Sequence, residues 1–242
     1  ETAMGNSRST FETEGNLRPP FDADDAETSL LCRIACVLPG TDAGVPGANV
    51  DMEKTCTAAN LLQEEGRIGL AKNLYKKVLS VDPNHHLACY NLGSICFDEK
   101  KYSQALFHFE RALVSRRDDL DTSINIMVTL MNLDRLEEAG NFGLKALENY
   151  PSNPVLLYNL GNCCLSSSGK IRDAVRHFST LLQIESAHSD AMFNLAIAHQ
   201  KLDNHDLALK YYQDAVALDP SLSPSCNGVI SALQKKKKNM GK

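Results

Sequence analysis

The sequence contains no tryptophan, and aromatic residues make up only 6% of it. It has no apolar run near the roughly 18 residues that a membrane-spanning helix needs, so no membrane span is predicted. A basic segment followed by the apolar stretch of a secretory signal is also missing. These absences favour a chain that works in the cytoplasm, with the nucleus as an alternative.

The sequence also lacks the short motifs that carry catalysis. It has no GxSxG, no phosphate-binding loop, no HExxH and no Rossmann glycine pattern. His108 and His177 occupy equivalent positions, which favours a structural or surface role over a catalytic one. Paired carboxylates such as those of Asp118 and Asp119 lie near expected helix starts, where the helix dipole favours them. We therefore expect no enzyme activity and no cofactor.

None of the eight cysteines belongs to a CxxC motif. Most lie at apolar positions, where a thiol behaves as a small hydrophobic group. The neighbours Cys163 and Cys164 cannot form a disulfide with each other without distortion. Cys32 and Cys36 are one helical turn apart and could supply half a metal site, but no matching pair is evident. The sequence thus predicts reduced thiols, as in cytosolic proteins, and no metal.

The net charge is −5, and the last eight residues hold five lysines and no acid, which leaves −10 for residues 1–234. An acidic body argues against nucleic acid as the main ligand. The run Lys235–Lys238 could be a nuclear import signal or a membrane-surface patch. The simpler interpretation is that these lysines form a short, solvent-exposed segment where a helix ends.

What the sequence does contain is a repeat. Asparagines recur in steps of 34, 34 and 35 residues, at Asn91, Asn125, Asn159 and Asn194. Alanines keep the same period, at Ala71, Ala105, Ala139, Ala174 and Ala208. Four residues after most of these alanines stands an aromatic residue: Tyr75, Phe109, Phe178 and Tyr212. Such a period indicates an array of small units rather than a single core.

Each unit is expected to be a helix, a turn and a second helix. The predicted units are 52–85, 86–119, 120–153, 154–188 and 189–222, followed by a capping helix at 223–234. Outside the array we expect a cloning scar at 1–5, an N-terminal arm at 6–50 and a basic tail at 235–242. The arm should carry one amphipathic helix at about 24–38. This helix either caps the first unit or lies in the concave groove of the array.

The order of residue types in each unit resembles the tetratricopeptide repeat. In the fourth unit the matching residues are Leu157, Leu160, Gly161, Cys164, Ala174 and Phe178. The resemblance covers about 52–234. It implies an all-α, right-handed superhelical solenoid of five helix-turn-helix repeats, with a capping helix at the C-terminal end. The first helix of each repeat should line the concave face.

The third unit departs from the pattern in two places. Met127 stands where the other units have Gly or Ala, and Gly143 where they have an aromatic residue. Met127 could fill the volume that Gly143 leaves empty, or the unit could be a soft joint in the solenoid. The fourth unit has one extra residue within 165–170, which we expect in the turn.

The resemblance places an asparagine ladder, Asn91, Asn125, Asn159 and Asn194, on the concave face. A carboxamide both donates and accepts hydrogen bonds, and similar arrays use such amides to hold the backbone of an extended peptide. Asn60 and Asn162 should extend the ladder. Beside it runs an apolar rail of preceding residues: Tyr90, Ile124, Tyr158 and Phe193. The alternative is that Tyr-Asn-Leu-Gly is simply the commonest sequence at this position of the repeat and has no role in binding.

One specialised use in this family, binding a chaperone's C-terminal carboxylate, is disfavoured by the residues. Cys56 stands where a lysine is needed, and Asp121 and Asn125 where two basic residues are needed. The groove should instead be mildly acidic and favour Lys or Arg in a ligand, because of Glu53, Glu64, Asp98, Asp121 and Asp190.

These observations predict a non-enzymatic scaffold that binds a peptide segment of a partner protein in the concave groove. Two alternatives remain open. One is a structural scaffold that self-associates. The other is the regulatory repeat region of a longer enzyme whose catalytic part lies outside this sequence.

Overall fold

The computed structural model describes residues 51–240, with side chains described as far as residue 238. Within this part every regular element is a helix, which confirms the predicted all-α fold. The predicted scar, the arm and its helix at about 24–38 lie outside the described residues. The helices are α2 (Met52–Glu64), α3 (Ile68–Val81), α4 (His86–Asp98), α5 (Tyr102–Ser115), α6 (Leu120–Asn132), α7 (Leu136–Asn149), α8 (Pro154–Ser166), α9 (Ile171–Ile184), α10 (Ser189–Lys201), α11 (His205–Leu218), the 3-10 turn η1 (Pro220–Leu222) and α12 (Ser223–Met240).

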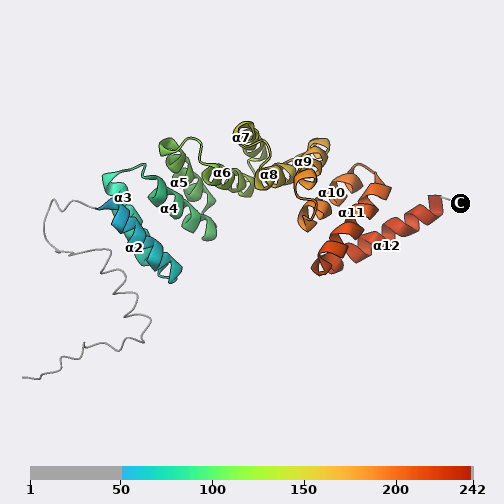
Figure 1. Cartoon of the computed structure of the whole chain (residues 1–242), viewed down its shortest axis with the longest axis horizontal. Helices are drawn as coiled ribbons and strands as arrows, with labels where there is room; N and C mark the ends of the chain where they lie inside the picture. Colours follow the sequence, from blue (N-terminus) through green and yellow to red (C-terminus); the bar gives the residue numbers. More distant parts are fainter. Residues whose placement is uncertain (1–50, 241–242) are drawn as a thin grey trace, which may run out of the picture. The chain divides into compact units, whose positions relative to one another are not determined.

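The helices α2 to α11 form five consecutive hairpins, which we number 1 to 5 in chain order (Figure 1). The first helix of each hairpin has 13 residues and the second has 14. Hairpin 4 keeps both lengths, so its extra residue lies in the turn between α8 and α9, as the sequence predicted.

The turn inside each hairpin contains one residue with a left-handed backbone, namely Gly66, Lys100, Asp134, Gly169 or Asp203. A left-handed conformation costs a non-glycine residue roughly 1–2 kcal/mol, so the surrounding bonds must hold it. In hairpin 2 the backbone N–H of Lys101 donates to the Cys96 carbonyl at 2.8 Å, which satisfies a free carbonyl at the end of α4. The same bond recurs from Arg135 to Leu130 at 2.9 Å in hairpin 3.

A side-chain cap begins the first helix of every hairpin. Asp119 accepts a bond from the Thr122 N–H at 2.9 Å, and Asn153 accepts one from the Leu156 N–H at 2.9 Å. The five capping residues are Asp51, His85, Asp119, Asn153 and His188. Such caps accept hydrogen bonds from backbone N–H groups in the first turn, which have no partner within the helix. They therefore define where the first helix of each hairpin begins.

Close packing inside a hairpin joins a small residue of the first helix to an aromatic ring of the second. A Cβ atom added to Gly161 would lie 2.5 Å from the Phe178 ring, and one added to Gly93 would lie 2.7 Å from the Phe109 ring. The rings are fully buried. The missing side chain therefore lets the two helices approach each other.

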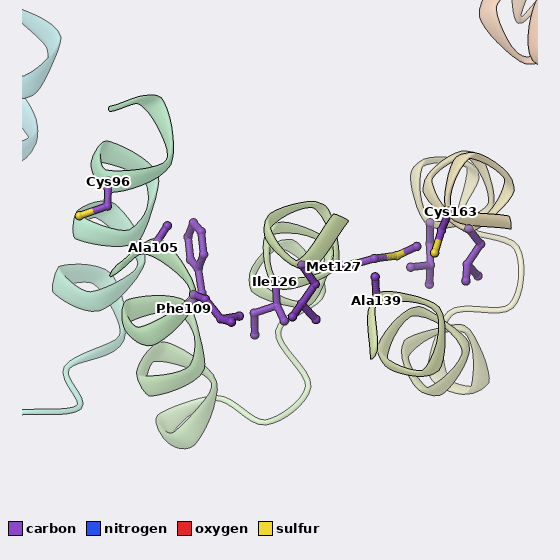
Figure 2. Close-up of a cluster of buried hydrophobic side chains, with 11 residues drawn as sticks. Cys96, Ala105, Phe109, Ile126, Met127, Ala139 and Cys163 are labelled. Atoms are coloured by element: carbon purple, nitrogen blue, oxygen red, sulfur yellow. The ribbon is translucent and has the colours of Figure 1, made fainter. Parts of the chain in front are cut away.

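Hairpin 3 reverses this arrangement. A Cβ atom on Gly143 would lie 2.6 Å from the Met127 sulfur and 2.8 Å from a methyl carbon of Leu160. Met127 is fully buried and points toward Ala139 and Cys163 (Figure 2). Met127 thus fills the space above Gly143, which is the volume exchange that the sequence suggested.

Neighbouring hairpins pack mainly through the second helix of one and the first helix of the next, as α5 packs on α6 and α7 packs on α8. The first helices also contact one another. Contacts join α4 to α6, α6 to α8 and α8 to α10, whereas the second helices of neighbouring hairpins have no comparable contact in the described part. We call the surface formed by α2, α4, α6, α8 and α10 the inner face. The second helices form the outer face.

The helix α12 covers the last hairpin. Cys226 and Leu233 are buried against Ala208 and Tyr212, and Val229 and Ile230 pack beside them. The predicted end at residue 234 needs correction, because α12 continues to Met240 through the lysine run. The predicted basic tail at 235–242 is thus helical as far as Met240, and Lys237 forms an ion pair of 2.7 Å with Asp206.

Candidate functional site: the inner face

The inner face carries a stripe of four positions on each first helix. They are spaced i, i+4, i+7 and i+11, which places them on the same side of a helix. In α6 they are Asp121, Asn125, Val128 and Asn132. Each asparagine of the predicted ladder takes the second of these positions, and each is partly exposed. The residues Asn60 and Asn162 take the third position.

Where hairpin 1 meets hairpin 2, which we call the first junction, the side-chain amide of Asn91 is hydrogen-bonded within the protein. The Asn91 Nδ2 donates to Asn60 Oδ1 at 2.8 Å and to the Tyr75 hydroxyl at 3.0 Å. The Tyr75 hydroxyl in turn donates to Asn60 Oδ1 at 2.6 Å. Burial raises the pKa of Tyr75 to about 12, so the hydroxyl stays neutral. This network links three helices of hairpins 1 and 2.

Where hairpin 4 meets hairpin 5, the same pair of amides recurs, with a tyrosine from α8 instead of one from a second helix. The Asn194 Nδ2 donates to Asn162 Oδ1 at 2.8 Å and to the Tyr158 hydroxyl at 3.4 Å. Asn60 and Asn162 therefore do not extend a row of free amides. They accept hydrogen bonds from the ladder asparagine of the next hairpin, and so hold neighbouring hairpins together.

The two central amides have no such partner. Ser94 stands at the third stripe position before Asn125, and its hydroxyl donates to the carbonyl of Tyr90 at 3.1 Å. Val128 stands there before Asn159 and cannot accept a hydrogen bond. Within residues 51–240 the Asn125 side chain makes no hydrogen bond. The Asn159 Nδ2 donates only to the Val155 carbonyl of its own helix, at 2.9 Å.

The aromatic rail is part of the packing. Tyr90 meets the Phe109 ring edge-on with centroids 5.9 Å apart, and Phe193 meets the Tyr212 ring in the same way at 5.7 Å. Such edge contacts stabilise aromatic pairs. Tyr158 also stacks on His188 at 5.2 Å. The rail residues are half-buried, so they form the border of the inner face. Ile124 has no ring to meet, because hairpin 3 has Gly143 instead.

Two apolar residues of the inner face were missed by the sequence-based prediction. Leu87 and Val155 are 43% and 51% exposed, and both take the first position of the stripe. The other hairpins have the acidic residues Glu53, Asp121 and Asp190 there. The signal was present in the sequence, because residues four positions before a ladder asparagine share its side of the helix.

The charge of the inner face is negative, as expected. The predicted acidic residues Glu53, Glu64, Asp98, Asp121 and Asp190 are all exposed. None of them is in an ion pair among the described residues. Asp121 lies one helical turn before Asn125 on α6, and Asp98 takes the last stripe position of α4.

Other kinds of site find little support. In residues 51–240 no cluster of three or more potential metal ligands occurs. The helices of this part include none with the length and apolar character to cross a bilayer. Burial lowers the pKa of both His108 and His177, which keeps these repeated histidines neutral at pH 7.

Comparisons with known proteins agree with this architecture. Two family models, both described as tetratricopeptide repeat, match residues 56–121 and 189–222. The chain is 26% identical over 175 residues to the protein O-mannosyl-transferase Tmtc3 of Drosophila melanogaster, covering 71% of this chain and 19% of that protein. It is 22% identical over 200 residues to human TMTC3, covering 80% of this chain and 22% of that protein. The chain thus spans only about a fifth of these relatives.

Solved structures share the fold. The structure of YrrB, described as a tetratricopeptide-repeat protein with an unusual peptide-binding site, matches with a TM-score of 0.63 and 23% identity, covering 70% of this chain and 87% of that one. The MamA fragment from Desulfovibrio magneticus matches with a TM-score of 0.66 and 14% identity, covering 72% of this chain and 98% of that one. Identities this low establish the fold alone. Residues 56–121 and 189–222 thus carry tetratricopeptide repeats, and the hairpins between them have the same architecture.

Proposed function

We propose that this chain is a non-enzymatic interaction module that binds an extended peptide segment of a partner protein on its inner face. The observation that carries the proposal is the difference among the ladder asparagines. Asn91 and Asn194 are bound within the protein, whereas Asn125 and Asn159 have capacity left for a ligand. A free carboxamide can donate to and accept from a peptide backbone whatever its sequence.

The spacing of the helices suits an extended ligand. Packed helices lie about 8–10 Å apart, and an extended chain rises about 3.3 Å per residue. Consecutive amides would thus meet backbone groups about three residues apart. Leu87 and Val155 offer apolar contacts on either side, and Asp98 and Asp121 favour a Lys or Arg in the ligand.

Capture of partners by the full chain tests the proposal. The wild type, the double variant Asn125→Ala/Asn159→Ala and a control would be used as bait, and captured proteins compared. The control is Asn73→Ala/Asn141→Ala, which removes two exposed amides from the second helices α3 and α7. We expect a set of partners that the control retains and the central variant loses. Identical sets for all three baits would refute the proposal.

A second candidate function is favoured by the relatives. Two of them are O-mannosyl-transferases of which this chain matches 19–22%, so the array could be the repeat region of a longer transferase. Its inner face would then hold the protein to be modified. Sequencing the transcript on both sides of this region decides the matter. A reading frame closed at both ends would remove this candidate.

The expected cytoplasmic location is also part of the proposal, and a self-associating scaffold is its alternative. All six described cysteines are buried and unpaired, as thiols used for packing in a reducing compartment such as the cytoplasm would be. Free thiols can be titrated after the protein is purified without reductant and then denatured. Fewer than eight free thiols would contradict a reducing compartment. Light scattering tests self-association, and a monomer at all concentrations would exclude it.

A further inference from the structure

A cleft opens on the outer face between α5 and α7. Its volume is about 240 Å³. Leu113, Phe142 and Ala146 form its apolar part, and Arg117 and Lys145 stand among its polar lining. None of these residues belongs to the inner face.

The cleft arises from the unusual sequence of hairpin 3. The aromatic residue missing at Gly143 occurs one position earlier, as Phe142. This ring is half-buried and lines the cleft, as well as a second cleft of about 340 Å³ beside Ile126 and Leu130. A ring that faces a groove between two helices leaves an apolar surface that a guest side chain can cover.

Lys145 lines both clefts, but their other charged residues differ. In the second cleft Arg135 is neutralised by Glu138, with two contacts of 2.7 and 2.6 Å. In the first, Arg117 and Lys145 are exposed and neither forms an ion pair within residues 51–240. Asp118 is the one acidic residue in its lining. The first cleft therefore combines an apolar floor with a net positive rim.

Hydrogen bonds hold the walls of this cleft in place. The Tyr150 hydroxyl donates to the Asp118 carbonyl at 2.7 Å, which ties the end of α7 to the turn that carries Arg117. The Ser123 hydroxyl donates to the Asp119 carbonyl at 2.8 Å below. A site formed before its ligand arrives loses less entropy on binding.

We propose that this cleft binds an acidic and apolar segment of a second partner. A Leu or Phe side chain of that segment covers Phe142, and flanking Asp or Glu residues pair with Arg117 and Lys145. Arginine suits carboxylates well, because its guanidinium donates two parallel bonds. The inner face, which is acidic, favours the opposite charge. The chain would thus connect two partners of opposite charge through opposite sides of hairpin 3.

Three synthetic peptides test the proposal on the full chain. The first has Leu-Phe at its centre and two acidic residues on each side. The second replaces the acidic residues with lysines, and the third replaces Leu-Phe with Ser-Ser. Nuclear magnetic resonance of the labelled chain shows where each binds. We expect the first peptide alone to shift resonances at residues 113–123 and 142–150. Shifts by the first peptide that are confined to the inner face, or equal shifts at residues 113–123 and 142–150 with the lysine peptide, would overturn the proposal.

A charge-reversal variant completes the test. Arg117→Glu/Lys145→Glu changes two exposed side chains, so folding should be unaffected. Loss of two exposed charge pairs should weaken binding of the acidic peptide about tenfold. The control Lys76→Glu/Lys77→Glu reverses two exposed lysines on α3 and should bind as the wild type does. Undiminished binding by the first variant, or an equal loss in the control, would also overturn the proposal.

Discussion

Hairpin 3 and its two neighbours fill the space between their paired helices with different residues. In hairpins 2 and 4 a glycine on the first helix faces a rigid ring on the second. In hairpin 3 the large residue is the flexible Met127 and the small one is Gly143, on the other helix. The exchange keeps the core filled, and it moves the aromatic residue outward to Phe142. The array packs with this exchange, and the outer face gains the half-buried ring of Phe142.

The junctions between hairpins show a parallel difference. At both ends of the array, amides on neighbouring first helices bind each other, through Asn60 with Asn91 and Asn162 with Asn194. On either side of α6, Ser94 and Val128 remove that option. The ends of the inner face thus use asparagine for cohesion, while the centre leaves asparagine available.

The largest effect is expected from adding a methyl group inside a hairpin. In Gly161→Ala the new Cβ would lie 2.5 Å from the Phe178 ring. Overpacking of this kind costs about 1–3 kcal/mol of unfolding free energy. A gain in helix propensity of about 1 kcal/mol acts in both variants, because both glycines lie inside helices. In Gly143→Ala the atoms met are the ends of the flexible Met127 and Leu160 side chains, which can move aside, so the net loss should be smaller. Urea denaturation of both variants checks this. Equal losses would contradict the comparison.

A smaller effect is expected at the junctions. Asn91→Ala removes two hydrogen bonds, to Asn60 and to Tyr75, and should cost about 1 kcal/mol of unfolding free energy. Asn125→Ala removes no hydrogen bond within the described part and should stay within about 0.5 kcal/mol of the wild type. Thermal denaturation under identical conditions measures both. A loss at Asn125 as large as at Asn91 would show that the central amide is structural too.

The smallest effect concerns pH and a single histidine. Burial lowers the pKa of His177, with Arg176 adding to the shift and Asp173 opposing it. A histidine with a depressed pKa in the folded state contributes full stability above its unfolded pKa of about 6.5. That stability declines as the pH falls below this value. His177→Gln should therefore lose less stability than the wild type between pH 7.5 and pH 5.5.

The equivalent position in hairpin 3 provides the control. Phe142 stands there and does not titrate, so Phe142→Leu should leave the pH dependence unchanged. The difference in melting temperature between the two pH values is the measurement. A wild-type pH dependence in His177→Gln would mean that the remaining histidines, such as the buried His199, account for all of it.

Most of the fold could be predicted from the period. The recurrence of Ala71 and its equivalents fixed the hairpins, and keeping the period in both helices placed the extra residue in the turn before α9. The end of α12 could not be predicted as well. Lysines at 235–238 are good helix formers, and neither Gly nor Pro follows until residue 241, so composition suggested a tail where local propensity favours a helix.

The site was harder to predict than the fold. The period identified each ladder asparagine, yet whether its amide is free depends on the residue at another position of the preceding hairpin. Comparing Asn60, Ser94, Val128 and Asn162 with the next ladder residue would have separated the four cases. The cleft beside Phe142 had no such signal, because it depends on how Leu113 and Lys145 from different helices come together.

The side-chain amide resonances of the ladder asparagines test the central claim most directly. A peptide spanning the segment captured by the wild type would be titrated into the labelled full chain. The account predicts that the Asn125 and Asn159 side-chain resonances shift with the peptide concentration, while those of Asn91 and Asn194 stay in place. Uniform shifts at all four, or shifts confined to Asn91 and Asn194, would contradict it.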